Sequence, residues 1–358
     1  MSDRFDVAIV GGGPAGTAAA ITLRSHAPQL RILLLEAGRY DRPKAGEVLP
    51  ALAGSVLDRL GVRETFDEAG FAPALATAAA WAEPGRSERH SLFSAAGQGW
   101  HLDRARFDRL LADAAEARGA DVRLGRSVRS ASAVANGWRL GLASGEAVDA
   151  EQLIWATGRS WRLARPLGAR VRVHEERTAY IRTFEASQRD GTTLIEARPE
   201  GWWYSADLPG RRRVVACVTD AQSAQAYGLG SAEGWRRALR ATRHVASAVG
   251  EEAVESVAIV RPAGTVTLDP VCGPGWFAAG DTAFAADPLS SRGLLSALRS
   301  GIFAAYAAAD CALGEHERSV ARYAGLAAAD LAGYREALAL HYARVPREEP
   351  FWRTAATP

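Results

Sequence analysis

The apolar residues at the start of the chain follow the pattern of a buried strand, a turn and a helix. Residues 7–10 (VAIV) are continuously apolar, a glycine-rich turn follows, and an alanine-rich segment continues beyond it. A second apolar run at 32–35 (ILLL) ends at Glu36. Buried parallel strands have such continuous runs, so this order predicts a strand, a helix and a second parallel strand.

Helical periodicity is clearest in the segment HLDRARFDRLLADAAEARGA, residues 101–120. It puts Phe107, Leu110, Leu111 and Ala114 on one face, which predicts an amphipathic helix. The other elements predicted before residue 165 are a helix from about Pro50, an irregular stretch at 65–100, and strands at 121–124 and 152–158.

Strand-like segments dominate residues 166–262. Four of them (TAYIRTFEA, TTLIEARP, WWYSADLP and RRVVACVTD) are followed by a predicted helix at 232–249. The segment WFAAGD then returns to a buried strand, and helices are predicted at 294–313 and 318–343. The chain therefore carries a β-rich insertion between two parts of one α/β unit.

The turn after the first strand, GGGPAG, carries a dinucleotide-binding fingerprint. Gly11 permits the tight turn, Gly13 lets the backbone approach a pyrophosphate, and Gly16 allows close packing of helix on strand. Glu36 lies where a carboxylate binds both ribose hydroxyls and would repel a 2′-phosphate, which indicates FAD or NAD rather than NADP. A glycine-rich turn in another kind of α/β protein is the alternative.

A second motif, GDTAFAADPLSSRG, begins at Gly280. Asp281, at the end of a buried strand, is placed to accept a hydrogen bond from a ribityl hydroxyl, and the helix that begins near Gly293 would direct its N-terminal amides at a flavin ring. A simple helix cap is the alternative. The predicted cofactor contacts are those of Gly11, Gly13, Pro14, Ala15, Gly16, Glu36, Ala37, Arg104, Val128, Thr157, Gly158, Gly280, Asp281, Pro288, Gly293 and Leu294.

These patterns predict an α/β (α+β) fold with a glutathione-reductase-like, FAD-binding Rossmann domain that is discontinuous. We expect that domain at 1–165 and 263–315, a β-rich substrate domain at 166–262, and a C-terminal helical segment at 316–358.

Composition excludes several classes of protein. The formal net charge of +2 arises from scattered residues, so no basic patch predicts nucleic acid as a partner. The three cysteines are widely spaced, which fits neither a zinc cluster nor a disulfide framework, and no other grouping predicts a metal site. No apolar run approaches the length of a membrane span, and no signal peptide precedes the first strand, so we expect a cytoplasmic protein that does not contact a membrane.

The candidate chemistry beyond the cofactor rests on few residues. Glu47 follows Gly46 on a loop, His101 precedes the helix of Arg104, and Asp287 lies in the second motif. They are the candidate acids or bases, although a loop carboxylate is often merely exposed and a lone histidine is usually structural. An aromatic wall for a substrate is predicted from Trp202, Trp203 and Tyr204, of which only alternate members can face one side of a strand. Core packing is the alternative for this trio.

The chain resembles the flavoprotein monooxygenases that include tryptophan halogenases and geranylgeranyl reductases. The resemblance rests on VGGGPAG, KAGEVLP, HLDRARFD, WATGRS, GWWYSADLPG, AAGDTAFAADPLSSRG and the terminal PFW. Within this group it is most similar to the maturation flavoproteins that hydroxylate a protein tryptophan during tryptophylquinone biogenesis in bacterial amine oxidases (the lysine ε-oxidase and glycine oxidase maturase type).

The resemblance implies hydroxylation of an electron-rich aromatic ring, a tryptophan, indole or phenol, through a C4a-hydroperoxyflavin. It implies dioxygen as co-substrate and NAD(P)H or a separate flavin reductase as electron source, with a small-molecule or protein-borne aromatic substrate. Halogenation is disfavoured, because the only lysine, Lys44, precedes Gly46 and Glu47, whereas halogenases carry one beyond that loop. A flavin-dependent C=C reductase and a non-enzymatic flavin-binding assembly partner are the remaining alternatives.

Overall fold

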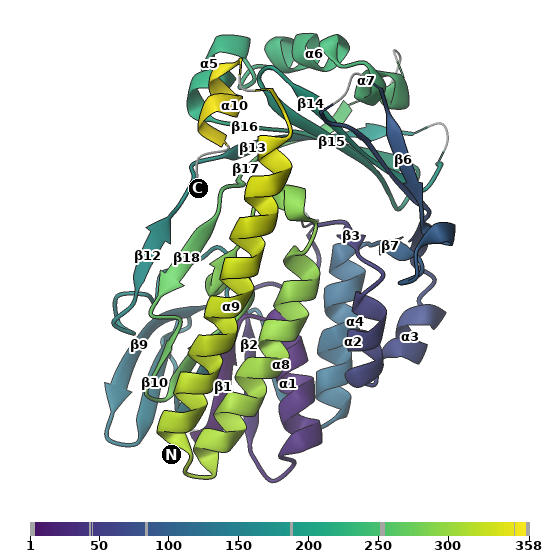
Figure 1. The fold of residues 1–358 in the computed structure, drawn as a ribbon. Coiled ribbons are helices and arrows are strands. Elements are labelled where there is room, and N and C mark those ends of the chain that lie inside the picture. The colour runs from purple at the N-terminus through teal and green to yellow at the C-terminus, as the bar shows by residue number, and fades with distance from the viewer. Residues whose placement is uncertain are drawn as a thin grey trace.

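An eight-stranded sheet built around the first predicted strand forms the lower half of the molecule (Figure 1). The computed structural model describes residues 4–42, 44, 46–82, 85–186, 189–250, 255–346 and 348–355. The strand order is β19-β20-β11-β1-β2-β8, and the hairpin of β9 and β10 pairs with β11. Strands β20, β11, β1, β2 and β8 run parallel to one another. The bounds are β1 (Arg4–Val10), β2 (Ile32–Glu36), β8 (Asp121–Leu124), β9 (Val128–Val134), β10 (Gly137–Leu142), β11 (Ala147–Trp155), β19 (Cys272–Gly273) and β20 (Trp276–Ala278).

Helices cover one face of this sheet and enclose the main core. Helix α1 (Pro14–His26) packs against the sheet, α4 (Arg104–Ala117) and α8 (Gly293–Ala312), with α2 (Ala53–Arg59) and α3 (Arg63–Glu68) beside them. In α4 the predicted apolar face is confirmed, because Phe107 and Leu111 are fully buried and Leu110 and Ala114 pack against the same core. The Rossmann-type α/β architecture predicted from the sequence is therefore confirmed.

A seven-stranded sheet forms the upper half, with the order β17-β13-β16-β15-β14-β5-β6. Its bounds are β5 (Ala76–Ala80), β6 (Ser87–His90), β13 (Thr178–Glu185), β14 (Thr192–Arg198), β15 (Gly201–Leu208), β16 (Arg212–Thr219) and β17 (Glu255–Pro262). Three short helices cover its outer face: α5 (Ala221–Tyr227), α6 (Ala232–Ala241) and α7 (His244–Val249). The sheet combines strands from two separated parts of the chain, since β5 pairs in parallel with β14.

Two sequence-based expectations about local structure were wrong. The stretch 65–100 is not irregular: besides β5 and β6 it contains β4 (Ala72–Ala74), the 3-10 turn η1 (Ser91–Phe93) and the start of β7 (Gly99–His101). These strands are only three to five residues long, which leaves little periodicity to detect. The helix predicted at 232–249 is divided into α6 and α7 at Thr242, whose backbone is extended (φ −73°, ψ 151°).

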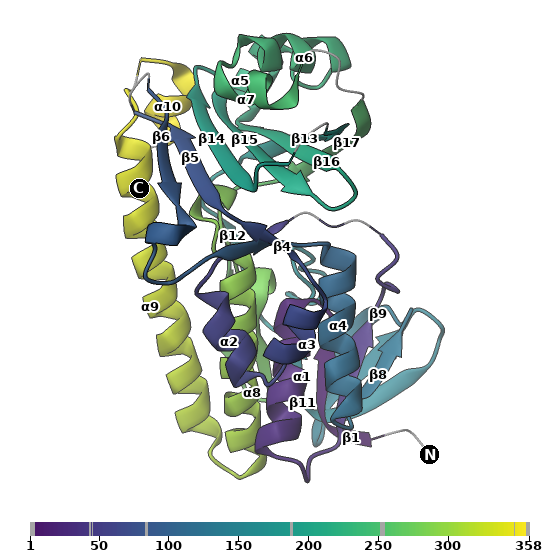
Figure 2. The same ribbon diagram turned by 90° about the vertical axis from the view of Figure 1, so that its right-hand side faces the viewer.

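The long helix α9 (His316–Ala343) connects the two halves. It packs on α8 below and reaches the inner face of the seven-stranded sheet above, where α10 (Pro350–Ala355) follows (Figures 1 and 2). The two predicted C-terminal helices are thus confirmed. Two small sheets complete the fold, β3-β7-β4 with β3 (Val48–Leu49), and β12-β18-β21 with β12 (Arg170–Val173), β18 (Val266–Asp269) and β21 (Phe284–Ala285). Within the described ranges, no helix is long and apolar enough to cross a membrane.

Candidate functional site

A cavity of about 690 Å³ lies between the carboxyl ends of the parallel strands and the inner face of the seven-stranded sheet. The strand ends contribute Val10, Glu36 and Thr157, and the upper sheet contributes Ile181 and Val218. The crevice outside the carboxyl ends of parallel strands is where open α/β sheets bind ligands. Except for Gly16, every residue predicted from the sequence to contact a cofactor lines this cavity.

The glycine-rich turn leaves one end of the cavity open to an anion. A Cβ atom on Gly11, whose φ is +109°, would lie 2.2 Å from the carbonyl oxygen of Ala156, and one on Gly16 would lie 1.8 Å from that of Gly11. A Cβ atom on Gly13 would meet no atom within 4 Å. Helix α1 begins at Pro14 without a side-chain cap, so its first amides and its partial positive charge are available to a phosphate.

Glu36 is held by the backbone at the end of β2. Its Oε2 accepts a hydrogen bond from the amide of Gly12 at 2.6 Å, and its Oε1 accepts one from the amide of Gly38 at 2.7 Å. An ionised carboxylate can accept about four hydrogen bonds, so capacity remains for the two hydroxyls of a ribose. Ala37 and Val128 line the cavity beside it.

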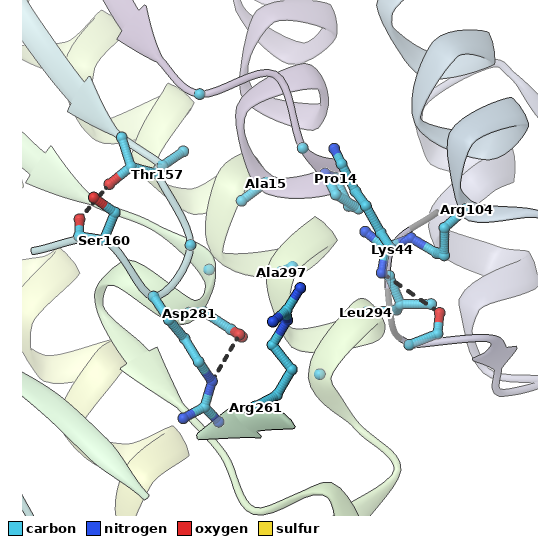
Figure 3. Close-up of a pocket in the computed structure, with 18 of the residues that line it drawn as sticks. Pro14, Ala15, Lys44, Arg104, Thr157, Ser160, Arg261, Asp281, Leu294 and Ala297 are labelled. Carbon is cyan, nitrogen blue, oxygen red and sulfur yellow. Dashed lines mark hydrogen bonds and ion pairs between the residues drawn. The ribbon is translucent and has the colours of Figure 1, made fainter. Parts of the chain in front are cut away.

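Two cations line the cavity close to the first turn of α1. Lys44 Nζ lies 2.9 Å from Asp108 Oδ2, and Arg104 Nε lies 3.2 Å from Asp108 Oδ1. Figure 3 shows Lys44 and Arg104 grouped with Pro14 on one side of the cavity. Because two cations share one carboxylate, the group keeps a surplus positive charge that matches a pyrophosphate.

Asp281 lies on the opposite side of the same cavity, in the 3-10 turn η2 (Gly280–Thr282). Burial raises the pKa of its carboxyl above the usual value, and the nearby cations Arg159 and Arg104 oppose that shift. Arg159 Nε lies 3.6 Å from Asp281 Oδ2, while its other nitrogens donate to the carbonyl oxygens of Gly264 and Ala286, each at 2.9 Å. The carboxylate is therefore held at the cavity wall with an oxygen free to accept from a ribityl hydroxyl.

The turn after β11 is fixed by Thr157. Its Oγ1 accepts from Trp155 Nε1 at 2.5 Å and donates to the carbonyl oxygen of Ser160 at 2.7 Å. Gly158 follows with φ +64°, and a Cβ atom there would meet nothing within 4 Å. The hydroxyl of Thr157 thus shapes the turn, and the backbone of Thr157 and Gly158 faces the cavity.

The start of α8 forms the far end of the cavity. The turn η3 (Pro288–Ser290) and Ser291, at φ +49°, lead into the helix, which has no side-chain cap. Gly293 and Leu294 line the cavity, and the space around the Cα of Gly293 is equally open. Uncapped amides beside a residue without a side chain suit a ring that becomes negatively charged on reduction.

The seven-stranded sheet supplies an apolar and aromatic wall. Along β15 the side chains alternate, so Trp202 and Tyr204 line the cavity. Trp203 does not, contrary to the expectation that included it: it lies on the other face of the sheet, 5.1 Å from the ring centroid of Trp235, and its Nε1 donates to Glu200 at 2.6 Å. The alternation that the sequence predicted therefore removes Trp203 from the wall.

The three candidate acids or bases have different surroundings. Glu47 lines the cavity, where burial raises its pKa and Arg104 partly opposes that shift. Tyr204 lies near enough that the charge of Glu47, together with burial, keeps the pKa of the Tyr204 hydroxyl well above its usual value. A carboxyl group with a raised pKa in a cavity is a candidate for moving a proton near neutral pH.

Asp287 and His101 are less suited to that task. Asp287 lines the cavity, but its carboxylate is ion-paired with Arg177 and accepts from Tyr342 at 2.9 Å and from the amide of Leu289 at 2.8 Å. His101 lies outside the cavity, in β7, with Nε2 3.4 Å from the carbonyl oxygen of Gly191. Burial lowers the pKa of His101. The expectation that His101 reaches the site was wrong, because β7 pairs with β3 and β4 and the ring lies beside Gly191, outside the cavity.

Several cavity residues were not predicted from the sequence. Arg159 directly follows the Thr157–Gly158 turn, so its position next to a cofactor strand was a usable signal. Arg261 projects into the cavity from β17 (Figure 3), and Lys44 joins Arg104 on the buried Asp108. Asp108 stands one helical turn after Arg104, a spacing that favours an ion pair on a helix. Nothing in the local sequence of Arg261 distinguishes it from other polar residues.

The cavity fits FAD along its whole length. One end has the Rossmann-type sheet, the open glycine turn at a helix N-terminus and the carboxylate for the ribose, and the far end has the second motif. These features define an FAD-dependent oxidoreductase. The chain belongs to the FAD-binding domain family, whose model matches residues 4–305. Among its relatives is LodB of Marinomonas mediterranea, which bears the name of an FAD-dependent oxidoreductase. LodB is 30% identical over 314 residues, which cover 83% of each chain.

Halogenases are similar as well. The 1H-pyrrole-2-carbonyl-[peptidyl-carrier protein] chlorinase of Pseudomonas fluorescens is 26% identical and aligns with 84% of this chain and 75% of its own. The structure of the myxobacterial chondrochloren halogenase CndH has a TM-score of 0.91 at 22% identity, covering 99% of this chain and 86% of that one. The peptidyl tryptophan dihydroxylase QhpG has a TM-score of 0.75 at 22% identity, covering 98% and 78%. At these identities the solved structures show a shared fold.

Proposed function

We propose that this protein is an FAD-dependent monooxygenase that hydroxylates an electron-rich aromatic ring, an indole or a phenol, including the ring of a tryptophan within another protein. The observation that carries the proposal is the wall of Trp202 and Tyr204, which faces the same cavity as Glu47 and the start of α8. Aromatic side chains favour offset or edge contacts with other rings, so this wall suits an aromatic substrate.

The residues of the chain would divide the work along the cavity. Gly13, Glu36 and the cations Arg104 and Lys44 would hold the nucleotide, and Asp281 the ribityl chain. FAD, once reduced, supplies the activation of dioxygen at its ring. Ile181, Val214, Ala216 and Val218 line the same cavity with apolar side chains, which would exclude water from the ring.

Glu47 is the residue that we propose to handle the substrate proton. With its pKa raised by burial, its carboxylate would accept the proton of a phenol O–H before oxygen transfer, or the proton that the ring loses as it regains aromaticity afterwards, and would release that proton to solvent. The high pKa of Tyr204 keeps that hydroxyl protonated, so Tyr204 can donate a hydrogen bond beside the same carboxylate.

The position of the lysine supports hydroxylation over halogenation. The resemblance to halogenases places their lysine beyond the Gly46–Glu47 loop, where it handles hypochlorous acid. Here Lys44 Nζ is ion-paired with the buried Asp108, next to Pro14 and Arg104 at the nucleotide end of the cavity (Figure 3). A lysine held at that end by Asp108 is not placed to direct an oxidised halogen toward the aromatic wall.

The relatives support a substrate carried by another protein. QhpG is named as a peptidyl tryptophan dihydroxylase, and the chlorinase is named for a substrate on a peptidyl-carrier protein. We propose NAD(P)H or a separate flavin reductase as the electron source and dioxygen as the co-substrate.

Intact mass spectrometry tests the proposal. The FAD-loaded protein, reduced and then exposed to oxygen, is incubated with indole, with tyrosine-like phenols and with tryptophan-containing peptides. A gain of about 16 Da per inserted oxygen is expected for at least one aromatic substrate. Loss of this product in Glu47→Gln with retained FAD would support the proton role. The proposal is wrong if the products instead gain two hydrogens without oxygen, as a C=C reductase would give, or if chloride replaces hydrogen on the ring.

A further inference from the structure

The aromatic wall and the loop before α8 are joined by one hydroxyl group from the C-terminal helix. Tyr342 Oη donates to Asp287 Oδ2 at 2.9 Å and accepts from Trp202 Nε1 at 2.9 Å. All three side chains are at most 1% exposed. Asp287 begins the turn into α8, and Trp202 lines the cavity from β15, so Tyr342 contacts both sides of the far end.

The surroundings of Tyr342 restrict it to this arrangement. The guanidinium of Arg177 lies 4.2 Å from the centre of the Tyr342 ring and is ion-paired with Asp287. A second tyrosine on α9, Tyr334, accepts a hydrogen bond from the backbone amide of Asp287 at 2.8 Å. The turn that leads into α8 is thus held by α9 through its carboxylate and its amide.

Removing the hydroxyl of Tyr342 would take one partner from each of two buried groups. The folded state is destabilised when a buried indole N–H or a buried carboxylate loses a hydrogen-bond partner. Both groups would then shift toward other polar groups. Such shifts would move Trp202 relative to the aromatic substrate and Asp287 relative to the flavin end. Tyr342 itself does not line the cavity.

We propose that Tyr342 is a positioning residue that fixes the substrate wall at Trp202 to the flavin-side turn at Asp287. The proposal rests on the proposed function for the identity of the two sides, but its measurements do not require hydroxylation. It extends the active centre to Tyr342 on α9, which lies 55 residues beyond Asp287 and 140 residues beyond Trp202 in the sequence.

The test compares Tyr342→Phe with Tyr323→Phe in the FAD-loaded protein. Tyr323 is a matched control, because it is also a buried tyrosine of α9 whose hydroxyl donates to one backbone carbonyl, that of Ala278. The readouts are the visible absorption spectrum of bound FAD, the dissociation constant of FAD, and that of indole measured from its perturbation of this spectrum. Urea unfolding of both variants compares their loss of stability.

We expect Tyr342→Phe to shift the flavin spectrum and to weaken indole binding by about tenfold, the effect of roughly one buried hydrogen bond. Tyr323→Phe should leave both within about twofold of the parent even at a similar loss of stability. The effects of Tyr342→Phe and Trp202→Phe on indole should be non-additive, because they remove the two ends of one hydrogen bond.

The proposal is overturned if Tyr342→Phe and Tyr323→Phe give the same flavin spectrum and the same FAD and indole affinities. Should the parent protein not bind indole, an unchanged spectrum and FAD affinity in Tyr342→Phe overturns it equally. Failure of the proposed function shows itself differently, as the absence of oxygenated product from the parent protein while the spectral effect of Tyr342→Phe persists.

Discussion

Replacing Gly16 by alanine should destabilise the fold, whereas replacing Gly13 by alanine should weaken the binding of FAD and leave the fold intact. At Gly16 the added Cβ would stand 1.8 Å from the carbonyl oxygen of Gly11, whereas Cβ contacts below 3.0 Å essentially do not occur. Helix α1 would have to move by about 1.2 Å, the difference between these distances. It cannot move away freely, because a Cβ on Gly301 of α8 would lie only 2.1 Å from the carbonyl oxygen of Ala15 on its other side.

The cost of Gly16→Ala therefore belongs at the upper end for overpacking, about 3 kcal/mol of the free energy of unfolding. Gly13→Ala places its methyl in open space, and Gly13 has an ordinary φ of −75°. That change should leave the apoprotein unaffected or stabilise it by about 0.4–1 kcal/mol, because alanine restricts the unfolded chain. The same methyl stands where a pyrophosphate must approach, so FAD should bind at least about tenfold more weakly.

Urea unfolding of the apoproteins gives the stability, and quenching of flavin fluorescence on titration gives the dissociation constant of FAD. The reasoning is refuted if Gly16→Ala unfolds within about 1 kcal/mol of the parent, since the helix would then have room to move. It is refuted equally if Gly13→Ala binds FAD as tightly as the parent does.

Three further outcomes are expected. Arg177→Met should lower the free energy of unfolding, measured in urea, by about 3–5 kcal/mol, because it leaves the buried carboxylate of Asp287 without its cation. Adding Asp287→Leu should recover most of that loss. A loss below about 1 kcal/mol for Arg177→Met alone would contradict the role of the pair. Burial raises the pKa of Glu47 above its ordinary 4.5, so the folded state holds this proton to higher pH than the unfolded chain, and Glu47 lowers stability as pH rises through that window. Glu47→Gln should therefore make the free energy of unfolding, measured from about pH 4 to 8, fall less steeply on raising the pH, and an unchanged slope would count against the shift. Asp281→Ala should raise the FAD dissociation constant at least about tenfold, while Arg159 keeps its two carbonyl partners. Asp113→Ala, at an exposed carboxylate, serves as the control. Equal FAD dissociation constants for the two variants would rule out a contact between Asp281 and the ribityl chain.

The sequence predicted well the elements whose signal is local. The first strand, the glycine turn and α1 carry a continuous apolar run followed by helix-forming residues, and α4 has one apolar face. Pairings between distant segments were less accessible. Strand β5 pairs with residues more than one hundred positions later, and its small residues give no strand-like alternation, so the stretch 65–100 was mistaken for irregular structure.

The candidate site divides along the same line. The positions of the glycine turn, Glu36, Asp281 and Gly293 were predicted from the sequence, because each belongs to a motif whose turn or strand end is formed by neighbouring residues. For Trp202 and Trp203 the sequence predicted that neighbours alternate, but which of them faces the cavity depends on the elements packed on each side, α9 on one and α6 on the other. His101 illustrates the opposite error, since proximity to Arg104 in sequence did not bring its ring to the cavity.

By itself the sequence determined the Rossmann-type unit, the FAD-type fingerprint and the resemblance to flavin monooxygenases, because each motif that carries them is a short continuous stretch of the chain. Only the tertiary structure decided which charges are paired. Arg104 and Asp108 are one helical turn apart, but Lys44 joins them across 64 residues. Arg177 and Tyr342 meet at Asp287 across separations that no local pattern encodes. The physical reason is that burial and electrostatic pairing act through space, whereas periodicity and turn chemistry act along the chain.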